Sequence, residues 1–396
     1  MITPISRRTG LMLGTTMLTA LAGGLFTSHA ALAQDAVKIG IVSPMSGPNA
    51  RYGAFSNRGA ELAVKEINAA GGIDGHQLEL YAADSQGTPV EGVSATRRLV
   101  DQDGVGFVIG DVSSSVTLAM QPVAEDAGVL LLNAASSNPK ITYGAGVGGF
   151  KWTFRNYPTD ENRAYVVTKY AAEQGLTKFA VLSVDSDYGR AAIEFSKKYL
   201  PEFDGEIVSE DYYKEGEVDF RSVLAKIRDS GAQAIMMYGL ADTTPIVARQ
   251  MIETGIAGKL PLVGNAEFNT ESTIKAAPQA LEGAIEAAAW LPAWDSERSK
   301  AFVAAFQDAY GEMPNNHAYV HWETIHLLAQ AIDEADSTDQ ATVRDALAKI
   351  KYESAVGEVT FDDHNQARLP MILLRVENGE PSIKGAYTAE IEYPTQ

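Results

Sequence analysis

Two clusters of serine residues have the chemistry of an anion-binding site. Ser113, Ser114 and Ser115 follow one apolar segment, and Ser136 and Ser137 follow the next. Serine hydroxyls and the free backbone N–H groups at the start of a helix both donate hydrogen bonds to anions, so these residues could hold a carboxylate. A serine before a helix is also a common N-cap, which is the simpler interpretation for any one of them. The presence of two such clusters favours a small-molecule site.

The same serines raise the alternative of an exported hydrolase, with Ser114 or Ser137 as the nucleophile. Such a nucleophile needs a histidine base within reach, and none of the 6 histidines lies in a predicted site loop. The chain has no G-x-S-x-G, H-E-x-x-H or P-loop motif, and it has no cysteine. We therefore expect no catalytic residue, and the hydrolase is the distant alternative.

Two further patterns could signal a metal or a cofactor. His317 and His321 are four residues apart and would share one helix face, but Glu323 is out of phase for a third ligand, and the neighbouring Tyr319 indicates packing. The glycine-rich segment 144–149 does not open a helix after a strand, so it predicts a flexible loop rather than a dinucleotide site. We expect neither a metal nor a cofactor.

The elements that must position the serines alternate along the chain. Strands are predicted at 37–43, 77–83, 106–110 and 129–133, with helices at 55–67, 90–101 and 116–126 between them. The alternation restarts after residue 158, with strands at 178–184, near 207, at 234–239 and at 260–264, and helices at 161–174, 190–200, 220–230 and 245–254. Further helices are predicted at 296–310 and 317–335. Alternating strands and helices predict an α/β fold with two lobes, each a parallel sheet covered by helices.

In parallel sheets, ligands bind beyond the carboxyl ends of the strands. In the first lobe these ends are followed by loops 45–52, 111–115 and 133–138, which include both serine clusters. Tyr52, in the first of these loops, could cover an apolar ligand, although a lone aromatic residue could equally be partly buried filler.

The N-terminus has the layout of an export signal. Arg7 and Arg8 precede an uncharged stretch from Thr9 to Leu25, and an Ala-x-Ala site ends at Ala33. We expect residues 1–33 to be a signal peptide cleaved near Ala33 and the mature protein to lie in the periplasm. The twin arginine leaves the choice of export route open. Without a cysteine the chain cannot be a lipoprotein, and we expect no membrane anchor.

The composition excludes some partners. The chain has 396 residues, with 32 Lys and Arg against 51 Asp and Glu, and a formal net charge of -19. Such an acidic chain does not bind nucleic acid by neutralising phosphates, so we expect no nucleic-acid partner.

Several stretches, taken together, resemble one protein family. They are Ser46-Gly47-Pro48 with Tyr52-Gly53, the segment 68–75, Val108-Ile109-Gly110 before the serines, Asp187-Tyr188-Gly189, Val218-Asp219-Phe220 and the segment 357–362. Over residues 37 to about 387 the chain resembles the Leu/Ile/Val-binding proteins of ABC transporters, which are type I periplasmic binding proteins. The resemblance implies two Rossmann-like lobes joined by three crossovers, which close on a ligand like a hinge. Lobe 1 would take residues 36–156 and 292–361, and lobe 2 would take 157–291 and 362–396.

The resemblance also implies ligand contacts. Ser114, Ala135 and Ser137 match residues that hold the ligand carboxylate, Ala135 through its backbone, while Tyr52 and Tyr188 match aromatic contacts. We count Ser113 and Ser136 with them as candidate ligand-binding residues.

The chain departs from the family pattern where an amino group would bind. Ala266 stands where amino-acid binders have a carboxylate, with Glu267 one residue later, and Leu240 replaces an aromatic residue. Glu267 could bind an ammonium group or be a solvated loop residue. An unpaired buried ammonium group is costly, so the pocket must either use Glu267 or bind a solute without an amino group.

These observations predict a non-enzymatic, monomeric periplasmic binding protein that captures a small carboxylate-bearing solute and delivers it to an ABC permease. A branched-chain or other hydrophobic amino acid is the first expectation, and an aromatic or other carboxylate without an amino group is the alternative. A sensory protein that signals to a membrane receptor would use the same pocket.

Overall fold

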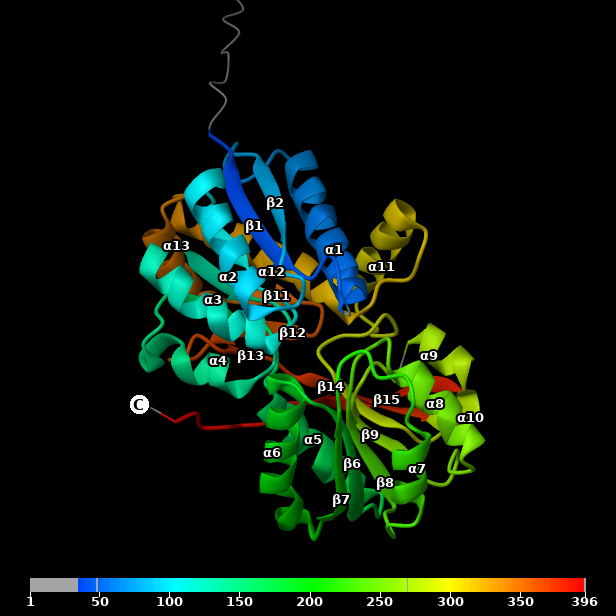
Figure 1. Ribbon diagram of the computed structural model, residues 1–396. Coiled ribbons are helices and arrows are strands. Elements are labelled where there is room, and N and C mark those ends of the chain that lie inside the picture. The colour runs from blue at the N-terminus through cyan, green and yellow to red at the C-terminus, as the bar shows by residue number, and fades with distance from the viewer. Residues whose placement is uncertain (1–34, 48, 269, 395–396) are drawn as a thin grey trace, which may run out of the picture.

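The computed structural model describes residues 35–47, 49–268 and 270–394. Two halves lie one above the other, each built on its own sheet (Figure 1). The predicted signal peptide lies outside the described residues. The α/β class with parallel-sheet lobes is confirmed.

The first sheet has five parallel strands in the order β2, β1, β3, β4, β5. Their bounds are β1 Val37–Ser43, β2 Leu78–Asp84, β3 Phe107–Ile109, β4 Leu130–Asn133 and β5 Thr153–Arg155. Helices α1 (Ala50–Ala69), α11 (Glu297–Tyr310), α12 (Asn316–Ala335) and α13 (Gln340–Leu347) pack over one face, and α2 (Pro89–Arg98) with α3 (Ser114–Ala127) over the other. A π turn at Leu99–Asp103 extends α2. The apolar cores on both faces bury strands β1, β3, β4 and β5 almost completely, whereas the edge strand β2 is partly exposed.

The second sheet has seven strands in the order β15, β14, β10, β9, β8, β6, β7. Their bounds are β6 Lys178–Val184, β7 Glu206–Tyr213, β8 Ala234–Tyr238, β9 Leu262–Asn265, β10 Ile285–Ala288, β14 Met371–Glu377 and β15 Glu380–Tyr387. Helices α5 (Asp160–Glu173) and α6 (Asp187–Tyr199) cover one face. The other face is covered by α7 (Arg221–Arg228), α8 (Thr244–Glu253), α9 (Glu271–Ala276) and α10 (Pro278–Leu281).

The chain passes between the sheets three times, after β5, after β10 and before β14. The third passage follows a small antiparallel sheet of β11 (Tyr352–Ser354), β12 (Gly357–Phe361) and β13 (Ala367–Arg368). The boundary predicted at residue 361 falls before β13. The lobe boundaries stay a prediction.

Two local predictions were wrong. Helix α1 begins at Ala50, so Tyr52 lies in its first turn and not in a loop. The segment 144–149 is a packed turn between α4 (Pro139–Gly144) and a 3-10 turn (Gly146–Gly148) rather than a free loop. The N–H of Val147 donates to the carbonyl of Asp363 at 3.0 Å, because this turn packs against the chain near the third passage.

Candidate ligand-binding site

A small cavity of about 70 Å³ lies between the two halves, at the carboxyl ends of their strands. We call it the inner cavity. Its lining comes from both halves: Asn49, Tyr52, Val112, Ser113, Ser114, Ser115, Ala135, Ser137, Tyr157, Arg163, Ser186, Tyr188, Glu215, Gly239, Leu240, Asn265 and His317. The position matches the general rule for ligand sites in parallel α/β folds.

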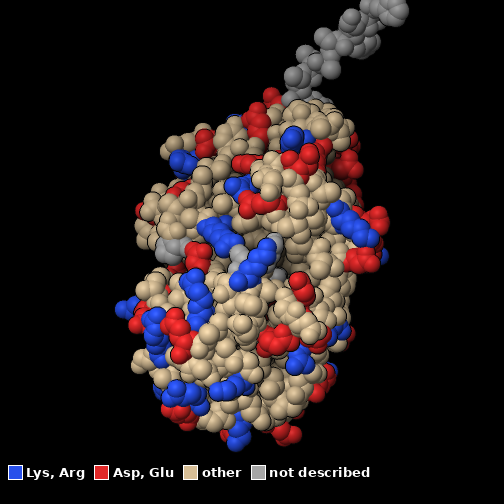
Figure 2. Space-filling view, turned by 90° about the vertical axis from the view of Figure 1, so that its right-hand side faces the viewer, with Lys and Arg blue, Asp and Glu red and all other residues tan. Residues whose placement is uncertain are grey.

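A larger cavity of about 920 Å³ adjoins it and is called the outer cavity here. Five residues line both cavities: Tyr52, Tyr157, Gly239, Asn265 and His317. Residues of α9 and of the chain on either side of α11 line the outer cavity. Figure 2 views this side of the molecule and shows Lys and Arg side chains gathered near the junction of the halves.

The first serine cluster lines the inner cavity. Ser113 is the N-cap residue of α3 but makes no capping hydrogen bond with its side chain, so capping does not explain it. Its hydroxyl lies 3.5 Å from that of Ser115, and the Ser114 hydroxyl accepts a hydrogen bond from the N–H of Asn138 at 3.3 Å. These hydroxyls lie beside the N-terminus of a 14-residue helix, which is a favourable place for an anion.

The two serines of the second cluster have different surroundings. Ser137 lines the inner cavity, whereas Ser136 is fully buried beneath it. The Ser136 hydroxyl donates to the carbonyl of Asp111 at 2.7 Å and lies 2.8 Å from the Thr117 hydroxyl. Ser136 therefore fixes the loop and does not line the cavity as expected. Neither serine is a helix cap, because Asn138 caps α4.

Two tyrosines face the inner cavity from opposite halves. Tyr52 in α1 is 8% exposed, and its hydroxyl accepts a hydrogen bond from the N–H of Ala241 in the other half. Tyr188 in α6 donates to the carbonyl of Asn265 at 2.8 Å. Burial raises the pKa of both phenols, so both are neutral.

The remaining expected contacts are spread over both cavities. Ala135 and Leu240 line the inner cavity, whereas Ala266 and Glu267 line the outer one. The backbone N–H of Ala135 already donates to the side-chain oxygen of Asn133 at 3.1 Å.

Glu267 is a buried carboxyl group rather than a solvated loop residue. Its side chain is 14% exposed, and its Oε1 lies 3.7 Å from Nε2 of His317 without a hydrogen-bond partner in the described chain. Burial, reinforced by the charge of Glu286, raises its pKa to about 8. The backbone of Glu267 has a φ of 56°, in the left-handed region, and the residue lines the outer cavity.

His317 is a site residue that the sequence did not reveal. It lies in the first turn of α12, and its ring centroid is 4.4 Å from that of Tyr52. Burial and the nearby His321 and Arg163 lower its pKa to about 3, so the imidazole is neutral at pH 7. His317 lies in none of the predicted site loops, and it lines the cavity because folding brings α12 there from a distant part of the sequence.

This histidine does not make a catalytic pair. No serine–histidine hydrogen bond joins the residues that line the inner cavity, and an imidazole with a pKa near 3 is a weak base. His321 instead has its Nδ1 2.8 Å from the carbonyl of His317. The described residues also contain no group of three or more His, Cys, Asp or Glu that could hold a metal.

A buried ion pair was also missed. Arg163 lines the inner cavity from α5, and its Nη1 contacts Asp160 at 2.8 Å. Asp160 follows Thr159, the N-cap of α5, and Arg163 is three residues later on the same face. That spacing was readable in the sequence, but which face of the helix meets the cavity depends on its packing against the second sheet.

Comparison with known proteins fits this geometry. A family model described as periplasmic binding protein matches residues 36–381. The chain belongs to the periplasmic binding protein family. The Leu/Ile/Val-binding protein homolog 1 of Brucella suis is 30% identical, over 87% of this chain and 91% of the relative.

Solved structures share the fold of this chain. The branched-chain amino acid transporter substrate-binding protein LivJ of Streptococcus pneumoniae, in complex with isoleucine, is 28% identical with a TM-score of 0.78 and covers 89% of this chain and 99% of its own. An R. palustris solute-binding protein in complex with benzoate is 21% identical with a TM-score of 0.81, over 90% of this chain and 98% of its own. In the described residues no helix is long and apolar enough to cross a membrane.

Proposed function

We propose that this periplasmic binding protein captures a small carboxylate-bearing solute between its two halves and delivers it to an ABC permease in the membrane. One observation carries the proposal: hydroxyls of Ser113, Ser114 and Ser137 line one small cavity that Tyr52 and Tyr188 close from opposite halves. Hydroxyls and helix N–H groups suit a carboxylate, and the tyrosine rings suit an apolar remainder. Binding would close the halves about the three chain passages.

The first candidate ligand is a branched-chain or other hydrophobic amino acid. The 28% identical LivJ structure with isoleucine and the 30% identical Leu/Ile/Val-binding relative support it. In this case the ammonium group would extend past Tyr52 toward Glu267, whose Oε1 has no hydrogen-bond partner in the described chain. An arriving ammonium would ionise that carboxyl and pair with it.

The second candidate is a carboxylate without an amino group, such as an aromatic acid. It is favoured by the lining of the inner cavity, where Arg163 is already paired with Asp160 and the one carboxylate among the described lining residues, Glu215, lies at an exposed position. Glu267 belongs to the outer cavity.

A thermal-shift screen with amino acids and aromatic acids tests the proposal. A solute at a hundred times its Kd adds about 2.7 kcal/mol to the free energy of unfolding, a clear rise in Tm. If no carboxylate of either class raises the Tm, the proposed function is wrong.

Glu267→Ala then separates the two candidates. An amino acid should lose about 2 kcal/mol of binding free energy or more, since its ammonium group would be left unpaired. An aromatic acid should bind the variant as it binds the native protein. Isothermal titration with the best ligand from the screen measures the difference, and the exposed Glu253→Ala variant is the control.

A further inference from the structure

Arg163 presents a hydrogen-bond donor that the protein leaves unused beside the inner cavity. The side chain is 1% exposed. Its Nε donates to the carbonyl of Ala287 at 3.2 Å and its Nη1 to Asp160 at 2.8 Å, while Nη2 is buried without a partner in the described chain. A buried N–H group without an acceptor costs free energy, so such groups are rare, and a ligand that supplies the acceptor is one explanation for this one.

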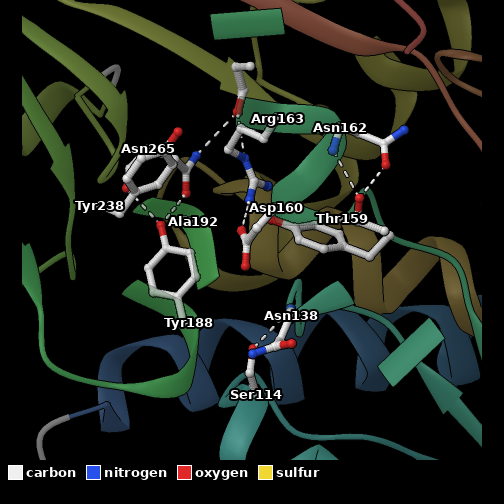
Figure 3. Close-up of polar contacts among 12 residues, drawn as sticks. Ser114, Asn138, Thr159, Asp160, Asn162, Arg163, Tyr188, Ala192, Tyr238 and Asn265 are labelled. Atoms are coloured by element: carbon white, nitrogen blue, oxygen red, sulfur yellow. Dashed lines mark hydrogen bonds and ion pairs between the residues drawn. The ribbon is translucent and has the colours of Figure 1, made fainter. Parts of the chain in front are cut away.

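The position of this guanidinium is opposite the serines. Figure 3 shows Arg163 with Asp160 below it, Tyr188 to one side, and Ser114 and Asn138 further down, so that in this view the carboxylate of Asp160 lies between the guanidinium and Ser114. Arg163, Tyr188 and Ser114 all line the inner cavity. A ligand whose carboxylate rests on the serines would therefore extend its far part toward Nη2.

The charges around Arg163 indicate what kind of acceptor fits. Asp160 is buried and already neutralises the guanidinium, and His317 on the same cavity is neutral because its pKa is lowered to about 3. A second carboxylate on the ligand would therefore be buried here without a cation to pair with. An uncharged ligand oxygen does not need a cation, and it can accept a hydrogen bond from Nη2 while the Arg163–Asp160 ion pair stays intact.

We propose that Arg163 selects solutes that carry, besides their carboxylate, an uncharged acceptor oxygen at the far end, such as a carbonyl or hydroxyl group. This inference rests on the proposed function, because it takes the inner cavity as the ligand site. It makes the ligand a two-ended polar molecule rather than a carboxylate with a plain hydrocarbon tail.

The test measures Kd by isothermal titration for three pairs of matched shape. They are 4-oxopentanoate against 4-methylpentanoate, 4-hydroxybenzoate against 4-methylbenzoate, and asparagine against leucine. In each pair that binds, the oxygen-bearing member should bind the native protein about tenfold more tightly or better, because the hydrogen bond from a charged donor is strong. A hydrocarbon member that binds as tightly as its partner overturns the inference.

The double variant Asp160→Asn/Arg163→Gln removes both charges together, so no unpaired buried ion remains. For this variant, the Kd of the hydrocarbon member divided by the Kd of the oxygen-bearing member of each pair should fall toward one. Arg163→Lys keeps the charge beside Asp160 but lacks the second nitrogen, and it should lower the ratio as well if the double variant does not fold. The exposed pair in Asp185→Asn/Arg190→Gln is the matched control and should keep the native ratio.

A purely structural role for Arg163 would lower the stability of these variants without changing the Kd ratio. That result would overturn the inference about Arg163 but leave the proposed function standing. If none of the six compounds binds the native protein, the inference falls together with the proposed function.

Discussion

Glu267 and His317 are two ionisable side chains that burial holds uncharged beside the cavities. The pKa of the carboxyl is raised to about 8 and that of the imidazole is lowered to about 3. At pH 7 both groups favour their neutral forms, so the 3.7 Å approach between them is a contact of neutral groups and not an ion pair. A ligand ammonium would change this balance by favouring the carboxylate.

The raised pKa of Glu267 makes stability depend on pH. The folded state holds the proton up to about pH 8, whereas the unfolded chain releases it near 4.5, so the stabilisation is complete below 4.5 and lost as pH rises through 8. His317 acts in the opposite direction, but only between its folded pKa of about 3 and its ordinary value of 6.5.

Between pH 6.5 and 8 we therefore expect the native protein to lose stability that Glu267→Gln retains. The difference between their free energies of unfolding should change by about 1.5 kcal/mol over this range. Urea unfolding at several pH values measures it, and other titrating groups such as Asp111 cancel in the comparison. Parallel stability curves would contradict the assignment.

At the scale of elements, a glycine at the start of a helix helps to place each of the two tyrosines of the inner cavity. Helices α1 and α6 each follow the first strand of their sheet and contain a Tyr-Gly pair in their first turn. A Cβ on Gly53 would lie 1.9 Å from the carbonyl oxygen of Pro44, and a Cβ on Gly189 would lie 2.1 Å from that of Val184. Only glycine lets each helix approach the preceding backbone so closely, which brings Tyr52 and Tyr188 to the cleft.

Gly53→Ala should therefore displace the start of α1. We expect a loss of about 1–3 kcal/mol in the free energy of unfolding and weaker ligand binding, because Tyr52 moves with the helix. Chemical denaturation and titration calorimetry measure the two effects. Ala54→Ser, at an exposed position of the same turn, should change neither, and a Gly53→Ala variant with native stability would contradict the steric argument.

At the scale of the whole molecule, side chains connect the two halves across the cleft. Asn138 donates to the carbonyl of Asp187 at 2.8 Å, Asn49 to Glu215 at 3.3 Å, and the Tyr52 hydroxyl accepts from the N–H of Ala241. These contacts hold the two halves close together across the cleft, and a ligand bound between the halves would add its own contacts to them.

Tyr52→Phe removes one of these contacts and leaves the N–H of Ala241 without its acceptor. We expect the ligand-free variant to open, with a larger radius of gyration in small-angle X-ray scattering, and to bind ligand about fivefold more weakly. Tyr81→Phe, which removes an exposed hydroxyl that donates to Glu79, is the control. An unchanged radius together with native affinity would contradict this role of Tyr52.

The sequence by itself determined the alternation of strands and helices and therefore the α/β class. Strands 37–43 and 178–184 were predicted with their exact bounds, because continuous apolar runs between turn residues are a local signal. The serines after β3 and β4 were likewise readable, since the carboxyl ends of neighbouring parallel strands meet at one edge.

Only the tertiary structure decided which side chains complete the cavity. His317 lies 202 residues after Ser115 in the sequence, and Arg163 lies within helix α5 and not in a loop directly after a strand. Which face of each helix meets the cavity is set by packing against the sheets. Ser136 and Glu267 look like site residues in the sequence, but the Ser136 hydroxyl is used in a buried hydrogen bond and Glu267 lines the outer cavity instead of the inner one. Local patterns specify elements, whereas the direction of a side chain depends on neighbours that only folding brings together.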